Sequence, residues 1–137
     1  MDFIVDGKPQ GKQRPRFSRI SKTVYTPNKT AKYEKQIAKA YTDSGGKCIP
    51  ADCYVSVSVS AFFPVPKSYS KKKREDCIER RLRPDKKPDM DNILKVVLDG
   101  LNHVAYVDDK QVVELIGRKY YTESDGYLWV SVREVKV

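Results

Sequence analysis

The strongest pattern in the sequence is a strict alternation of apolar and polar side chains over residues 53–63, CYVSVSVSAFF. One side of this segment carries Val55, Val57, Val59, Ala61 and Phe63. The other side carries Tyr54 and three serines. Because successive side chains of a strand point to opposite faces of a sheet, the segment is predicted to be a strand with one buried and one polar face.

Three further segments have the composition of strands. FIV, residues 3–5, precedes a turn at residues 6–7, and residues 111–121 and 127–135 are longer segments rich in apolar and aromatic side chains. Between the last two lies Asp-Gly at positions 125–126, which is typical of a hairpin. The pattern therefore predicts that the last two strands pair with each other.

Apolar residues recur at helical spacing in the remaining parts of the chain. A first helix begins near Thr30, and its apolar face consists of Tyr33, Ile37, Ala40 and Tyr41. Ser70 is a candidate N-cap for a charged helix over residues 71–82. A third helix, capped by Asp91 or Asn92, buries a stripe made of Ile93 or Leu94, Val97, Leu98 and Leu101.

This order of elements predicts an α+β fold, a single compact domain over residues 1–137 with a mixed or antiparallel sheet packed by about three helices. The alternating βαβ units of a nucleotide-binding sheet are absent from the pattern. No segment has the apolar length that a bilayer requires, so no membrane partner is expected, and no signal peptide precedes FIV, so we expect a cytoplasmic protein. Cys48, Cys53 and Cys77 are spaced neither for a disulfide framework nor for a zinc site.

Charge is distributed unevenly along a chain whose formal net charge is +9. Residues 8–35 hold nine Lys or Arg and one acid, and residues 67–87 hold ten basic residues and four acids. Residues 88–126 reverse the sign, with eight acids and four bases. The basic parts suit a polyanion and the acidic part a cation, although a basic protein also needs charged, solvated faces of both signs.

The acidic segment has the residue types of a metal site. Asp89 and Asp91 precede the third helix, Lys95 lies one turn inside it, and Asp108 and Asp109 follow it. We expect the connection after the helix to double back, so that both acidic pairs converge. Carboxylate oxygens without His or Cys suit Mg²⁺ or Mn²⁺. Such ions assist the hydrolysis of phosphodiesters by activating water. Lys95 could stabilise the negative charge that develops on the phosphate or position the attacking water.

Each of these residues also has a purely structural interpretation. Asp91 could serve only as an N-cap, and Lys95 could form a surface ion-pair ladder with Asp91 and Asp99. Asp108 and Asp109 could merely form a turn. His103 fits a polar helix end better than a metal ligand.

PDMDNILKVVLDGLNHVAYVDDKQVV, residues 88–113, resembles the signature of the RusA family of Holliday junction resolvases. The resemblance extends to the basic segment at residues 11–35 and to FPVPKSYSKKKR at residues 63–74. It implies a small α+β homodimer that cuts four-way DNA junctions with Mg²⁺. A non-catalytic module that binds branched DNA, and a nuclease that acts on flaps or other branched DNA, are the alternatives.

Carried over by position, the resemblance makes the metal-site motif of residues 88–113 the reaction centre. It implies that Asp89, Asp91 and Asp109, with Asp108, are metal ligands and that Lys95 is the catalytic lysine, while Asn92 and Gln111 brace the site. The basic loop of residues 11–30 and the charged helix would contact phosphates through Lys12, Arg14, Arg16, Lys22, Lys71, Lys72, Lys73 and Arg74. Phe17 or Tyr25 could stack on an opened junction base.

Overall fold

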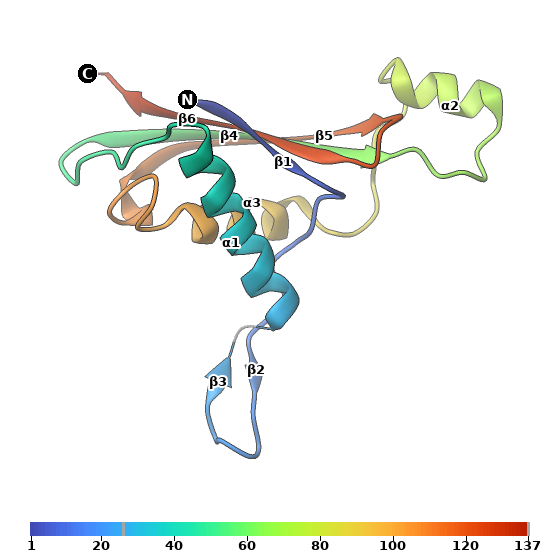
Figure 1. Cartoon of the computed structure of the whole chain (residues 1–137). Helices are drawn as coiled ribbons and strands as arrows, with labels where there is room; N and C mark the ends of the chain where they lie inside the picture. The colour runs from blue at the N-terminus through green and yellow to red at the C-terminus, as the bar shows by residue number, and fades with distance from the viewer. Residues whose placement is uncertain (26, 137) are drawn as a thin grey trace.

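A computed structural model describes residues 1–25 and 27–136, and its centre is a four-stranded sheet (Figure 1). The strand order across the sheet is β1-β6-β4-β5. β1 and β6 are antiparallel, β6 and β4 are antiparallel, and β4 and β5 are parallel. The predicted α+β fold with a mixed sheet is therefore confirmed. The bounds of these strands are Asp2–Asp6 for β1, Tyr54–Pro64 for β4, Val112–Thr122 for β5 and Tyr127–Val135 for β6.

The predicted hairpin between the last two strands is wrong, because β4 lies between β5 and β6. The connection instead crosses the end of β4, and Gly126 adopts a positive φ of 106° there. A Cβ at this position would lie 2.9 Å from the carbonyl oxygen of Phe62. The Asp-Gly signal thus marks a tight passage over a neighbouring strand. β4, the most regularly alternating strand, takes the central position and is hydrogen-bonded on both edges.

Helices α1, Asn28–Asp43, and α3, Met90–Leu101, cover one face of the sheet (Figure 1). Tyr33 and Ile37 of α1 and Ile93 and Val97 of α3 are buried against the valines of β4. A Cβ on Gly100 would lie 3.0 Å from the Glu34 carbonyl oxygen, so the glycine allows the two helices to approach closely. The core lies between these helices and the sheet.

Neither α1 nor α3 covers the opposite face of the sheet, and α2 lies on that side only at the end of the sheet (Figure 1). The serines of β4 lie there and are partly exposed, as the alternation predicts. Ile4, Ile116 and Trp129 on the neighbouring strands are exposed. This face of the sheet therefore combines partly exposed serines with exposed apolar side chains.

The charged helix is shorter than predicted. α2 spans Lys71–Ile78 and begins at the N-cap Ser70, whose hydroxyl oxygen accepts a hydrogen bond from the Lys73 N–H. The prediction of residues 71–82 fails because Arg80 adopts a φ of 67°, which a right-handed helix does not allow. None of the helices in the described residues is long and apolar enough to cross a bilayer.

A small hairpin is formed by β2, Arg16–Phe17, and β3, Val24–Tyr25. It projects away from the sheet on the side of α1 and α3 (Figure 1). The basic loop predicted over residues 11–30 therefore contains this hairpin and ends in the first turn of α1.

Candidate functional site

Asp89 occupies the N-cap position of α3, yet its carboxylate accepts no capping hydrogen bond. Aspartate is favoured at N-caps because its oxygens satisfy free backbone N–H groups, so an aspartate that does not do this is available for another partner. Asp91 lies two residues later in the first turn, and both side chains are exposed. The partial positive charge of the helix start therefore lies next to both carboxylates.

Lys95 is exposed one turn beyond Asp91 on α3. Among the ion pairs of the described residues, none includes Lys95. The interpretation of a ladder with Asp91 and Asp99 is therefore not supported within residues 1–25 and 27–136. The ammonium group remains available to an incoming anion.

The second acidic pair begins the short 3₁₀ helix η1, Asp109–Gln111. Asp108 is its N-cap, and the Asp108 carboxylate accepts a hydrogen bond of 2.9 Å from the Lys110 N–H, which lowers the pKa of Asp108. Gln111 completes a capping box: its side-chain oxygen accepts from the N–H groups of Val107 and Asp108. Asp108 thus has the structural role of a turn residue, while Asp109 is exposed.

Gln111 is buried and links this turn to the start of β4. Its side-chain nitrogen donates to the carbonyl oxygens of Pro50, at 2.8 Å, and Cys53, at 3.0 Å. The bracing role expected for Gln111 agrees with these contacts. Nearby, His103 contacts the Val107 carbonyl oxygen through Nδ1 at 2.7 Å and lies just beyond the end of α3, in keeping with its interpretation as a helix-end residue.

The two acidic pairs do not converge in one chain, and this corrects the expectation from the sequence. α3 has 12 residues and is therefore about 18 Å long, with Asp89 and Asp91 at its start and the other pair after its end. Val112, beside η1, pairs with Val55, whereas Lys119 pairs with Ala61 and lies close to Asp89. Seven residue steps of β5, about 23 Å, separate these positions.

No group of three or more His, Cys, Asp or Glu side chains in the described part of the chain could hold a metal ion. Asp89 and Asp91 nevertheless fit a hard cation as a pair. Mg²⁺ is commonly held by one or two carboxylates and completes its octahedron with water and substrate phosphate oxygens. The donor set at the start of α3 therefore fits Mg²⁺ bound together with a phosphate ligand.

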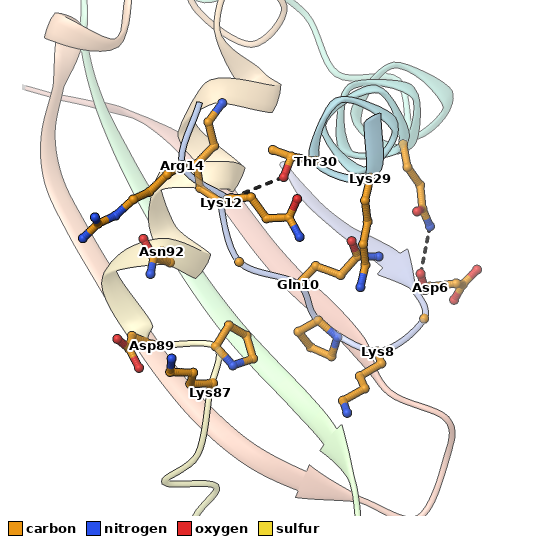
Figure 2. Close-up of a pocket in the computed structure, with 16 residues that line it drawn as sticks. Asp6, Lys8, Gln10, Lys12, Arg14, Lys29, Thr30, Lys87, Asp89 and Asn92 are labelled. Carbon is orange, nitrogen blue, oxygen red and sulfur yellow. Dashed lines mark hydrogen bonds between the residues drawn. The ribbon is translucent and has the colours of Figure 1, made fainter. Parts of the chain in front are cut away.

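A cavity of about 950 Å³ opens beside Asp89 (Figure 2). It is lined by residues 6–14, by side chains of α1 that include Lys29 and Thr30, and by Lys87, Pro88, Asp89 and Asn92. Figure 2 shows Lys87 next to Asp89, with Lys8 and Lys29 on the other side of the cavity. We call these three lysines, Lys8, Lys29 and Lys87, the pocket lysines. They surround the cavity with positive charge next to the free carboxylate.

The loop of residues 7–14 is held tightly against the start of α3. The Lys12 N–H donates a hydrogen bond of 2.8 Å to the Asn92 carbonyl oxygen. A Cβ on Gly11 would lie 2.8 Å from Pro88 Cβ and 3.1 Å from Asn92 Cβ, so only glycine fits without displacement. This contact fixes one wall of the cavity relative to Asp89.

Lys12 differs from its expected role as a phosphate contact. Its ammonium lies 3.2 Å from Glu34 Oε1 and 3.1 Å from Asp99 Oδ2, and its side chain is only 13% exposed. Burial disfavours the charge, but hydrogen bonds to Asp99 and Glu34 outweigh burial and raise the pKa of Lys12. We therefore assign Lys12 to holding the loop onto α1 and α3, and remove it from the DNA contacts.

The other predicted phosphate contacts fall into two groups. Arg14 lines the cavity, and Arg16 and Lys22 belong to the projecting hairpin. The predicted phosphate contacts on α2 lie beyond the end of the sheet (Figure 1). There, Lys72 pairs with Asp76 at 3.3 Å, and the Lys73 ammonium lies 4.0 Å from the centre of the Tyr69 ring. The four basic residues of α2 are Lys71, Lys72, Lys73 and Arg74.

Lys119 of β5 is a basic neighbour of Asp89 that the sequence did not indicate. Burial lowers the pKa of Lys119, and the nearby carboxylates of Asp89 and Asp85 oppose this shift. Its ammonium donates a hydrogen bond of 2.8 Å to the Lys86 carbonyl oxygen, which holds the segment leading to Asp89. Only the register of β5 against β4 places Lys119 here, so no local sequence signal could have revealed it.

Comparison with known proteins identifies the family of the chain. The chain is 39% identical over 137 residues to the Uncharacterized protein YqaN of Bacillus subtilis strain 168, an alignment that covers 97% of this chain and 95% of YqaN. The family model described as Endodeoxyribonuclease RusA matches residues 6–133, which include the cavity, α3 and η1. The chain therefore belongs to the RusA endodeoxyribonuclease family.

Proposed function

We propose that this protein is a Mg²⁺-dependent, structure-selective endodeoxyribonuclease that resolves four-way DNA junctions by paired phosphodiester hydrolysis, and that Mn²⁺ can substitute for Mg²⁺. The observation that carries the proposal is the uncommitted Asp89 carboxylate at the start of α3, next to Asp91 and the basic cavity. Membership of an endodeoxyribonuclease family supports DNA as the substrate.

In this proposal Asp89 and Asp91 hold the metal ion. The bound ion would supply an activated water molecule and relieve charge on the phosphate and on the leaving oxygen. Lys95 forms no ion pair within the described chain, so its ammonium is free to stabilise negative charge that develops on the phosphate. Lys95 follows Asp91 by four residues, about one helical turn, so its ammonium would lie near a phosphate bound at the carboxylates.

The pocket lysines would bind the phosphates that flank the cut. Each is exposed, and each lines the cavity beside Asp89. Phosphate contacts of this kind fix the position of the DNA backbone without reading its sequence. Arg14, at the same cavity, would continue this path toward the hairpin.

We further propose a homodimer, because symmetric cutting of two opposed strands requires two sites related by a two-fold axis. Asp109 is exposed but remote from Asp89 in its own chain. If the α3 helices of two copies run antiparallel across the axis, Asp109 of one copy approaches the Asp89–Asp91 pair of the other. Asp109 would then contribute to the site through the dimer.

The decisive experiment is incubation of the protein with labelled four-way, flap, duplex and RNA substrates in Mg²⁺. Cutting of the four-way junction is expected to exceed that of the other substrates. Asp89→Asn should abolish cutting and leave binding intact or tighter, because it removes a negative charge near the phosphate. Asp125→Asn, in the exposed β5–β6 connection, is the matched control and should cut normally.

The outcomes separate the alternatives. Binding of junctions without any cutting in Mg²⁺ or Mn²⁺ would leave a non-catalytic branched-DNA-binding module. Preferred cutting of flaps would retain the site and change the substrate. For the dimer, a mixture of the inactive variants Asp89→Asn and Asp109→Asn should regain nicking, because a mixed dimer carries one intact composite site. No recovery, with mixed dimers demonstrated, would place each site within one chain.

A further inference from the structure

The hairpin of β2 and β3 has an unusual combination of shape and composition. Arg16 pairs with Tyr25, and Phe17 pairs with Val24. The tip is formed by residues 18–23 and is closed by a hydrogen bond of 2.8 Å from the Ser18 N–H to the Thr23 carbonyl oxygen. The hairpin projects beyond the helices that cover the sheet (Figure 1).

Its apolar side chains are the most exposed of the large apolar residues in the described chain. Ile20 at the tip is 98% exposed, Val24 is 69% exposed and Phe17 is 60% exposed. Because Phe17 and Val24 are directly opposite one another, they lie on one face of the hairpin. Such exposure forgoes the stabilisation that burial provides, so folding does not account for these residues.

The charge of the hairpin indicates what covers these residues. Residues 14–25 contain Arg14, Arg16, Arg19 and Lys22 and no acidic residue. Cations that flank an apolar tip match the surface of nucleic acid, where phosphates surround the apolar faces of bases. The hairpin also continues directly from the cavity wall that carries Arg14, so a strand bound beside Asp89 would run toward it.

We propose that the hairpin is a wedge that enters the branch point of the DNA. Ile20 inserts between base pairs at the crossover, Phe17 and Val24 cover the exposed base faces, and the basic residues contact the flanking phosphates. Apolar side chains are inserted between base steps in this way by proteins that bend DNA. At a branch the stack is already interrupted, so opening it costs less than in a duplex. This inference rests on the proposed function, since it takes branched DNA as the ligand.

The test places 2-aminopurine at the branch point of a four-way junction and measures its fluorescence on binding in Ca²⁺, so that no cutting is required. Wild type should increase the emission, because unstacked 2-aminopurine is brighter. The double variant Phe17→Ser/Ile20→Ser should lose the increase and lose on the order of tenfold in preference for junction over duplex. Ile4→Ser, an exposed isoleucine on β1, is the control and should behave as wild type.

Two results would overturn the wedge. A double variant that retains the full fluorescence increase would show that the hairpin does not open the branch. A double variant that changes the oligomeric state instead would assign the hairpin to a contact between proteins. Failure of the proposed function is distinguishable, because a wild-type protein that increases the emission but never cuts in Mg²⁺ would remove the nuclease and leave the wedge.

Discussion

Replacement of the three pocket lysines by alanine tests whether the cavity beside Asp89 binds DNA phosphates. All three side chains are exposed, so their truncation leaves the core intact. Each phosphate contact contributes about 0.9 to the slope of log K against log salt concentration on duplex DNA. Loss of three contacts should therefore reduce the slope by about 2.7.

This change in slope has a large effect on affinity. When salt rises from 50 to 200 mM, wild type should lose about 40-fold more affinity for the junction than the triple variant loses, as the slope difference implies. The measurement is fluorescence anisotropy of a labelled four-way junction over this salt range, in Ca²⁺ to prevent cutting. Cutting in Mg²⁺ at saturating DNA should be much less affected, because these lysines bind the substrate and do not act at the reacting phosphate.

The control replaces three exposed lysines that do not line the cavity, Lys39, Lys47 and Lys136, by alanine. This variant has the same net charge as the pocket variant, so a general effect of charge would be equal in both. Equal slopes for the two variants would refute specific binding at the cavity. A pocket variant with the wild-type slope would remove the cavity from the DNA path altogether.

Two further substitutions test roles assigned above. Lys12→Met should lower the free energy of unfolding, measured by urea denaturation, by about 2 kcal/mol, which lies between the values for exposed and for fully buried ion pairs. Lys39→Met breaks the exposed pair with Asp43 and should lower it by less than about 0.5 kcal/mol. Because the pKa of Lys12 is raised above 10.5, the stabilisation that its charge provides should be complete below that pH and be lost only as the pH rises through the higher folded-state pKa. Equal losses of unfolding free energy in Lys12→Met and Lys39→Met would contradict the role of Lys12 in holding the loop. Lys95→Ala should lower the turnover rate at least tenfold and change junction affinity little, and an equal loss of both would argue against action at the reacting phosphate.

The sequence predicted best what depends on neighbouring residues. The alternation over residues 53–63 identified β4 and its buried face, because strand periodicity is a local property. The presence of α3 was predicted in the same way, but its start was not, because the predicted caps were Asp91 or Asn92 whereas the N-cap is Asp89 and the helix begins at Met90. The sequence could not reveal the place of β5 in the sheet. Nothing in the residues of β5 itself indicates whether it pairs with β4 or with β6. The misassigned β5–β6 hairpin and the unforeseen Lys119 have this one cause.

The expected convergence of all four aspartates failed for a related reason. The chain doubles back along α3 only with β5, and Asp108 and Asp109 precede that strand at the end of α3, where the hydroxyl of the buried Tyr106 donates to the Leu98 carbonyl oxygen at 2.7 Å. Gln111 then fastens the turn to the start of β4. The connection is thus held at the end of α3 by contacts between segments distant in the sequence. Spacing alone contains no information about such contacts.

The separation of the acidic pairs changes what each is able to do. Asp89 and Asp91 lie at the start of α3, and Asp89 also borders the cavity of the pocket lysines, so nearby positive charge offsets part of the repulsion between the two carboxylates. Asp109, at the far end of α3, adds a third carboxylate only where a second chain brings it near. In the homodimer proposed above, a single chain would hold the metal ion weakly, and assembly would strengthen binding at both sites together. If the proposed cutting of two strands of one junction is correct, this coupling ties the formation of each site to the presence of the other.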